Sequence, residues 1–227
     1  MQLVWGRHSL NCATIISNFN LLVDGSTFIK IMEDKIIIAQ VKQDFSKDLK
    51  NIILYLKDKG TERFRRDVLK AAKYPYFPMP TYYTTSNGHK YMIIAIARKR
   101  SSWKKLEYYF ARIINNKVYS FDSYENNIVI YPLHVFVRYR ERFLKDTNIP
   151  ISDVIKIFFK RNPIFLYKGR VDRTYMASCG DGVVFGIVKD GYRVVKTFIS
   201  TDMQFEKQKR LSVFLEKLRL EWWKELA

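Results

Sequence analysis

The first 43 residues show no helical spacing of hydrophobic positions. Short apolar runs at residues 27–31 and 36–41 lie on either side of a charged segment, residues 33–35. Short apolar runs bounded by polar turns are typical of strands. We therefore predict strands or irregular structure over residues 1–43.

The hydrophobic period then changes to that of a helix. Apolar residues recur three or four positions apart, at Phe45, Leu49, Ile52, Ile53 and Leu56. We predict a helix here, with Gly60 as the residue that ends it. A second helix is predicted from about residue 62 to residue 73, and three prolines within residues 75–80 close it.

From residue 81 onward the pattern favours strands. Runs rich in Ile, Tyr and Phe predict an antiparallel meander of strands at residues 91–98, 106–114, 118–122 and 128–131. Asn115 and Asn116 predict a hairpin turn, because asparagine tolerates a positive φ better than most residues.

Two helices, at residues 132–145 and 151–161, come next, and four strands follow, near residues 164–167, 170–177, 183–188 and 192–200. Asp190 and Gly191 predict a type I′ hairpin. A final helix is expected to carry an apolar face formed by Leu211, Phe214, Leu215, Leu218 and Trp222.

This order of elements predicts an α+β fold in which a mainly antiparallel sheet packs with helices. We divide it into residues 1–80, of mixed strand and helix, and residues 81–227, of sheet plus helices. One continuous domain is the alternative. The chain has 227 residues, enough for a substantial core.

Charge indicates the class of partner. Forty Lys and Arg residues against 22 Asp and Glu residues give a formal net charge of +18. Such an excess attracts phosphates, so we expect a nucleic-acid partner, with RNA favoured, although a basic surface that only aids solubility is the alternative. Two distant cysteines, no signal peptide and no long apolar run indicate a cytoplasmic protein without a membrane partner.

One face of the helix at residues 132–145 carries groups suited to phosphate chemistry. Helical spacing places five side chains within an arc of about 100°, namely His134, Arg138, Glu141, Arg142 and Lys145. Phe136 and Phe143 lie opposite and are expected to be buried. An imidazole can move a proton, and guanidinium groups can stabilise a phosphorane. A solvated face with internal ion pairs is the alternative.

A longer stretch resembles a known superfamily. It carries His134, Arg138, Glu141 and Arg142, then Ile149, then Ser152 to Ile155, then Asn162 and Pro163. Residues 131–202 are similar to the barnase–EndoU–colicin–RelE superfamily, nearest to the BrnT-like toxins and their uncharacterised relatives. The resemblance implies a RelE/barnase-like C-terminal core and, in active members, cleavage of RNA without metal.

The resemblance also implies roles for individual residues. His134 would be the general acid or base, Arg138 and Arg142 would hold the phosphate, and Thr197 in the last strand would contact it. A cognate inhibitor protein becomes a candidate partner. The toxins are far shorter than this chain, so two functions stay open: a metal-independent toxin-type endoribonuclease, and a non-catalytic RNA- or DNA-binding module of the same fold.

Two further segments are candidates for nucleic-acid binding. A basic stripe on the predicted second helix consists of Arg63, Arg66, Lys70 and Lys73. A predicted loop contributes Lys99, Arg100 and Trp103, where a base could stack on the indole. Lys145 adds a cation next to the helix face described above. For both segments, a solvated surface is the alternative.

We expect no metal site and no cofactor. Asp24, Glu33 and Lys35 only faintly resemble the acidic pattern of restriction-type nucleases. The three histidines and two cysteines are far apart, which excludes a zinc motif. The sequence also contains no glycine-rich phosphate loop, nucleophile elbow or dinucleotide fingerprint.

Overall fold

The computed structural model describes residues 25–122, 128–162, 166–169, 173–204, 209–210, 213–218 and 221. The chain forms two compact units, residues 1–47 and residues 48–227, which we describe separately. The proline-rich stretch at residues 75–80 lies inside the second unit. There it is irregular, apart from a bridge between Tyr76 and Ala97.

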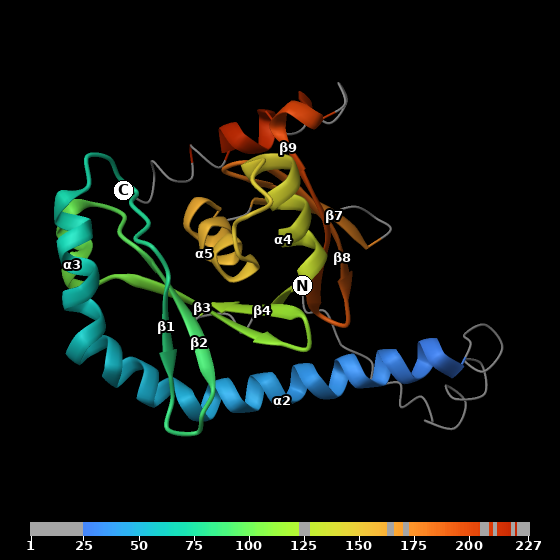
Figure 1. Ribbon diagram of the computed structural model, residues 1–227, viewed down its shortest axis with the longest axis horizontal. Helices are drawn as coiled ribbons and strands as arrows, with labels where there is room; N and C mark the ends of the chain where they lie inside the picture. Colours follow the sequence, from blue (N-terminus) through green and yellow to red (C-terminus); the bar gives the residue numbers. More distant parts are fainter. Residues whose placement is uncertain are drawn as a thin grey trace, which may run out of the picture. The chain divides into compact units, whose positions relative to one another are not determined.

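The strands predicted at residues 27–31 and 36–41 are wrong, because both runs lie in a long helix, whereas residues 1–24 of the same prediction lie outside the described residues. Helix α2 runs from Gly25 to Tyr55 (Figure 1). Three consecutive β-branched residues at positions 36–38 are typical of strands and obscured the helical spacing. Ile38, Val41 and Phe45 are buried at intervals of three and four residues, while Ile36 is exposed.

Gly60 does not end a helix as predicted. Its φ of −68° and ψ of −43° are helical, so the chain continues from the π-helical turn η1 (Leu56–Gly60) into helix α3 (Thr61–Lys70). A Cβ at Gly60 would lie 2.7 Å from Leu56 Cδ2, so the glycine permits close packing. Helix α3 ends at Lys70, ahead of the predicted end at residue 73.

The predicted class, α+β with a mainly antiparallel sheet, is confirmed. Within the described residues nine strands form one sheet in the order β1-β2-β3-β4-β5-β9-β8-β7-β6. The strands are β1 (Thr81–Thr84), β2 (Lys90–Ile96), β3 (Glu107–Ile114), β4 (Lys117–Asp122), β5 (Ile128–Pro132), β6 (Leu166–Gly169), β7 (Thr174–Cys179), β8 (Gly182–Lys189) and β9 (Tyr192–Ser200).

Both predicted hairpin turns are present. Asn115 and Asn116 have φ of 47° and 58° between β3 and β4, and Asp190 and Gly191 have φ of 48° and 82° between β8 and β9. Strands β5 and β9 form the one parallel pair among the described strands, with Val129 opposite Arg193. This pair joins the meander β1–β5 to the C-terminal strands.

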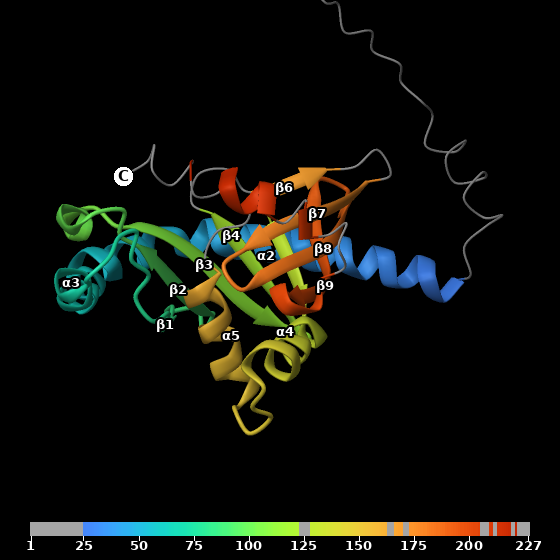
Figure 2. The same ribbon diagram turned by 90° about the horizontal axis from the view of Figure 1, so that it is seen from above.

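Helices α4 (Leu133–Tyr139) and α5 (Ile151–Arg161) lie together against one face of the sheet (Figures 1 and 2). The predicted helix at residues 132–145 changes at Arg140 to a π-helical turn, η3 (Arg140–Leu144). Phe136 is fully buried as predicted, whereas Phe143 is only partly buried.

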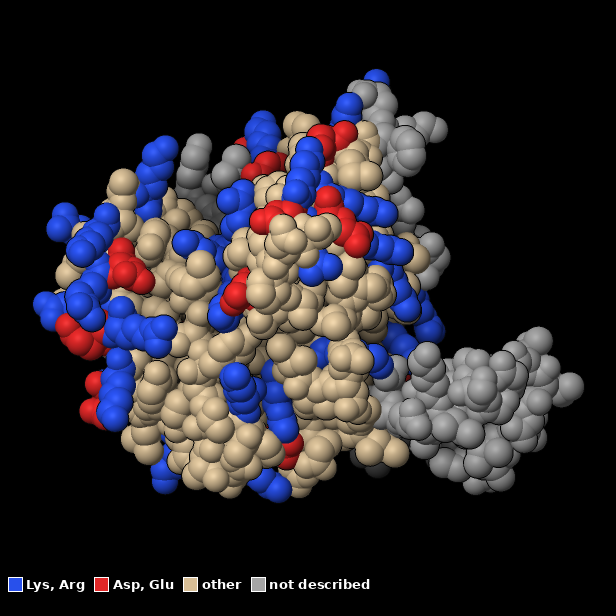
Figure 3. All heavy atoms as spheres, viewed as in Figure 1, with Lys and Arg blue, Asp and Glu red and all other residues tan. Residues whose placement is uncertain are grey.

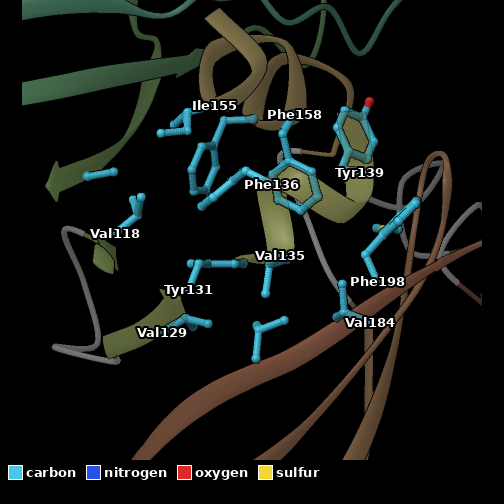
Figure 4. Packing of buried hydrophobic residues seen from close by; sticks show 14 of the residues in the cluster. Val118, Val129, Tyr131, Val135, Phe136, Tyr139, Ile155, Phe158, Val184 and Phe198 are labelled. Carbon is cyan, nitrogen blue, oxygen red and sulfur yellow. The ribbon is translucent and has the colours of Figure 1, made fainter. Parts of the chain in front are cut away.

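Aromatic rings fill the core between these helices and the sheet (Figure 4). The Phe136 ring meets Phe158 edge to face at 5.2 Å, and the Tyr139 ring meets Phe158 and Phe198 in the same way at 5.0 Å. Edge-to-face packing of this kind adds to the free energy gained by burial alone.

The opposite face of the C-terminal strands is covered differently. Met176 and Val183 point away from α4 and α5 and pack with Leu215. Beyond the short 3-10 turn η4 (Thr201–Met203), residues 213–218 are helical. Leu215 is buried, but Phe214 and Leu218 are exposed. Leu211 and Trp222 lie outside the described residues.

Across the described parts of the chain, no helix combines the length and the apolar character that crossing a membrane requires.

Candidate functional site

The two predicted basic segments lie side by side. The short helix η2 (Arg100–Lys104) packs against α3. The bridge between Tyr76 and Ala97 brings the chain around Lys73 next to the chain around Lys99. We define the α3–η2 cationic surface as the basic residues of these segments: Arg63, Arg65, Arg66, Lys70, Lys73, Lys99, Arg100, Lys104 and Lys105.

The α3–η2 cationic surface is strongly positive. Its nine cations face two carboxylates on the same segments, Glu62 and Asp67. All of the cations except Arg65 are exposed, while Phe64 and Val68 on the other side of α3 are buried. Figure 3 shows Lys and Arg side chains gathered along the edge where Figure 1 places α3, with acidic side chains among them.

Trp103 lies within this surface, with a cation over its ring. The Arg65 guanidinium carbon is 4.5 Å from the ring centroid, and Lys104 Nζ is 5.5 Å from it. Arg65 also forms an ion pair with Glu62 at 3.4 Å. Stacking on an indole fixes the direction of a guanidinium group. Part of the Trp103 ring, predicted to stack on a base, is therefore used to orient Arg65.

The predicted catalytic residues His134, Arg138 and Thr197 come together where α4 crosses β9. The exposed His134 ring places Nε2 2.8 Å from the carbonyl oxygen of Lys196. A carbonyl oxygen only accepts hydrogen bonds, so Nε2 is the donor. Nδ1 has no partner among the described residues and is the nitrogen that can exchange a proton with a ligand.

A β-bulge in β9 shapes this contact. Phe185 pairs with Thr197 and Gly186 pairs with Val195, so Lys196 has no partner residue on β8. A Cβ at Gly186 would lie 2.3 Å from the Val194 carbonyl oxygen, which explains the glycine opposite the bulge. Bulges redirect neighbouring groups and are frequent near active sites.

Arg138 is held in place by the strand. Its Nη1 donates a hydrogen bond of 2.8 Å to Thr197 Oγ1. The other guanidinium N–H groups and the Thr197 hydroxyl proton have no partner among the described residues. An oxyanion placed beside His134 could receive hydrogen bonds from both side chains.

Two other residues predicted on this helix face, Arg142 and Lys145, have no contact with His134, Arg138 or Thr197 among the hydrogen bonds and ion pairs of the described residues. Arg142 lies on η3 and is half-buried. Lys145 has a left-handed φ of 54° and is 3.8 Å from the Asp202 carboxylate, with both side chains exposed. We define the His134 site as His134, Arg138 and Thr197, because these side chains meet at one place.

Sequence reasoning missed a buried polar network behind the His134 site. The Asp181 carboxylate accepts hydrogen bonds from Tyr139 Oη at 2.5 Å, from Asn162 Nδ2 at 3.0 Å and from two nitrogens of Arg161 at 2.8–3.0 Å. Burial, followed by the hydrogen bond to Asp181, raises the pKa of Tyr139. No spacing rule connects α4, α5 and the β7–β8 turn, so only the fold shows this network.

A second missed network lies at the turn between β1 and β2. The fully buried Asp48 carboxylate is 2.6 Å from His89 Nδ1, 2.8 Å from Asn87 Nδ2 and 3.0 Å from Tyr91 Oη. Burial alone would raise the pKa of Asp48, but the hydrogen bonds from these three residues outweigh it and the pKa is lowered. The network holds the β1–β2 turn to Asp48, in the part of α2 that belongs to the second unit.

Within the described residues, no three His, Cys, Asp or Glu side chains form a cluster that could hold a metal ion. Asp24, part of the faint acidic pattern, lies outside these residues, and Glu33 lies in α2.

The chain was compared with three kinds of known protein. No protein-family model, curated protein or solved structure matches it. The resemblance of residues 131–202 to the barnase–EndoU–colicin–RelE superfamily therefore stays an expectation drawn from the sequence.

Proposed function

We propose that this protein binds RNA through the α3–η2 cationic surface. The observation that carries the proposal is the meeting of two basic segments, about 30 residues apart in the chain, on one surface with nine cations and two carboxylates. Neutralised phosphates release condensed counterions, which drives sequence-independent binding. The net charge of +18 adds long-range attraction for any polyanion.

The packing of α3 supports an RNA-binding surface over the alternative, a helix face that is only solvated. Arg65 is oriented by Trp103 instead of being free to turn in solution. A solvated face commonly balances its cations with carboxylates, but here Glu62 pairs with Arg65, which leaves eight exposed cations against the single carboxylate of Asp67. The surface can therefore follow a phosphate backbone.

The test compares two double variants of equal charge. Lys70→Gln with Lys104→Gln removes one cation from each segment of the surface. Lys50→Gln with Lys189→Gln removes two lysines elsewhere. Binding of a single-stranded 12-nucleotide RNA is measured between ~50 and ~200 mM salt.

We expect the first double variant to make the slope of log K against log salt shallower by about 1.4, since each single-strand phosphate contact contributes ~0.7. The control double variant should keep the wild-type slope. Equal changes in both variants would show that overall charge alone attracts the RNA, and the proposed surface would be rejected.

A metal-independent endoribonuclease is the second candidate function, favoured by the geometry of the His134 site. The RNA 2′-hydroxyl oxygen would attack the phosphorus while its proton passes to His134 Nδ1. The bond from phosphorus to the 5′-oxygen breaks, and that oxygen takes a proton from solvent. Arg138 and Thr197 would donate hydrogen bonds to the phosphorane oxygens.

Cleavage of mixed RNA in EDTA, followed by end-group analysis, tests this function. We expect 2′,3′-cyclic phosphate ends and intact DNA, because DNA has no 2′-hydroxyl. His134→Ala should lower turnover by roughly 10²–10⁴-fold while RNA binding persists. Lys189→Ala, a cation for which no role in the His134 site is predicted, serves as the comparison. If the wild type leaves all RNAs intact, the binding function stands without the catalytic one.

We further propose that this function belongs to the cytoplasm, because a chain with only two cysteines, one of them the buried thiol of Cys179, suits a reducing compartment. If the chain acts as a toxin-type nuclease, a cognate inhibitor protein is the expected protein partner.

A further inference from the structure

A groove next to the α3–η2 cationic surface has the chemistry of a nucleobase site. It is open, has a volume of about 550 Å³, and is lined by the end of α2, by η1, by β1 and by the β1–β2 turn. The lining residues are Asn51, Leu54, Tyr55, Asp58, Lys59, Tyr83 and Ser86. Because η1 leads directly into α3, the residues of η1 that line the groove are followed in the sequence by the first residues of the cationic surface.

Two tyrosines form an aromatic wall of the groove. The rings of Tyr55 and Tyr83 are stacked, with centroids 4.2 Å apart and planes inclined by 19°. Both side chains are only partly buried, and Leu54 beside them is 55% exposed. Exposed aromatic and aliphatic surface in a groove favours a flat apolar ligand, and stacked bases are held in this way on single-strand-binding proteins.

The polar groups of the groove are still available. Asn51 Nδ2 donates one hydrogen bond, of 3.4 Å, to Ser86 Oγ, which leaves the amide oxygen and a second N–H of Asn51 free to bind. Among the described residues, the Asp58 carboxylate and the Lys59 ammonium have no hydrogen-bond or ion-pair partner. The groove thus offers an amide, a carboxylate and a cation beside an aromatic wall.

These groups select among the bases. An asparagine amide pairs in a bidentate manner with the exocyclic amine and N7 of adenine. A carboxylate accepts a hydrogen bond from the exocyclic amine of adenine or cytosine, so the asparagine amide is the group that favours adenine. Guanine presents acceptors, O6 and N7, at the corresponding edge, and uracil has no exocyclic amine. Lys59, which also lines the groove, supplies a cation for a phosphate of the bound strand.

We propose that this groove binds one unstacked adenine of the RNA strand that the α3–η2 cationic surface holds. The inference rests on the proposed RNA-binding function and adds base preference to it. The groove also supplies the base stacking that was predicted for Trp103, because the Arg65 guanidinium lies over the Trp103 ring. The five-residue π-helical turn η1 contributes Asp58 and Lys59, and such turns are frequent at functional sites.

The test uses two single-stranded RNAs of 12 nucleotides, one all uridine and one with a single central adenosine. Both carry the same phosphate charge, so the cationic surface should hold them equally. We expect the wild type to bind the adenosine-containing strand about tenfold more tightly, within the range given by one base stack and one bidentate contact.

Two variants of the groove should abolish this preference. Asp58→Ala removes the acceptor from an exposed position, so its folding is secure, and Tyr83→Leu removes the stacking ring. Asp67→Ala is the matched control, because it changes the net charge by the same amount on exposed α3 surface outside the groove. It should strengthen binding of both strands without altering their ratio.

The outcomes separate this inference from the function on which it rests. Equal affinity of the wild type for both strands, or a preference that survives in Asp58→Ala and Tyr83→Leu, would overturn the adenine site and leave the cationic surface intact. Absence of binding to either strand would overturn the RNA-binding function and the adenine site with it.

Discussion

The buried network around Asp181 gives the sharpest stability prediction. Tyr139→Phe removes one hydroxyl group, which donates a 2.5 Å hydrogen bond to a carboxylate that is 5% exposed. Hydrogen bonds to charged groups contribute ~1.5–3 kcal/mol. The ring keeps its contacts with Phe143, Phe158 and Phe198 at 5.0–5.1 Å, so no cavity adds to the cost.

Asp181→Ala should cost more than Tyr139→Phe. It leaves the Tyr139 hydroxyl and the Asn162 amide without their shared acceptor in the interior, and loss of one partner from a buried charged network costs ~3–5 kcal/mol. Arg161 is half exposed and can turn to water. The double variant should be no less stable than Asp181→Ala alone, because the hydroxyl no longer has an acceptor.

Equilibrium unfolding in urea, followed by circular dichroism, measures these differences. Asp153→Ala is the control, since its ion pair with Lys156 is partly exposed and should contribute below ~1 kcal/mol. Additive effects of Tyr139→Phe and Asp181→Ala, or a Tyr139→Phe variant as stable as the wild type, would refute the network.

Because of the same Tyr139 hydroxyl, the free energy of unfolding should depend on pH in the alkaline range. The pKa of Tyr139 is raised by burial and by the bond to Asp181, so the folded state holds its proton when the unfolded chain releases one. Its contribution to stability is therefore complete below the unfolded pKa of ~10 and falls as the pH rises above it. Tyr139→Phe should lack this decline.

Three further variants follow from particular contacts. Phe136→Ala should lower the free energy of unfolding by ~3–5 kcal/mol in urea titrations, because its side chain is fully buried among rings. Gly186→Ala should cost ~1–3 kcal/mol, since its Cβ would lie 2.3 Å from a carbonyl oxygen, and the His134 ring signals in NMR spectra should shift as the bulge moves. The pKa of Asp48 is lowered, so its stabilisation is present above the unfolded pKa of ~3.9 and is lost as the pH falls through the folded value. Acid titration of Asp48→Asn should therefore show a shallower loss of stability below pH ~4 than the wild type.

Much of the second unit could be predicted because its signals are local. The meander, α5 and both hairpin turns follow from alternation, helical spacing and residues that tolerate a positive φ, such as Asn115 and Asp190. The helical phase of α4 also placed His134 and Arg138 on one face, and both lie beside β9. Local pattern was enough for these elements.

Other features depend on information that no local window contains. Helix α2 was mispredicted because β-branched isoleucines favour strands while their burial follows a helical period. Base stacking on Trp103 was predicted from the neighbours of this residue in the sequence. Arg65, whose guanidinium lies over the ring, belongs to another helix. The groove at Tyr55 and Tyr83 brings together α2 and β1, whose proximity only tertiary packing decides.

The parallel pair β5–β9 has a consequence for synthesis of the chain. Arg193 follows its partner Val129 by 64 residues, and translation at ~5–20 residues per second needs roughly 3–13 s to cover that distance. During this interval β5 is paired with β4 on one side only, its other edge has no strand beside it, and the apolar faces of α4 and α5 have only part of their sheet. Pulsed hydrogen exchange on ribosome-bound chains should therefore show the β5 amides that face β9 gaining protection only when β9 has emerged.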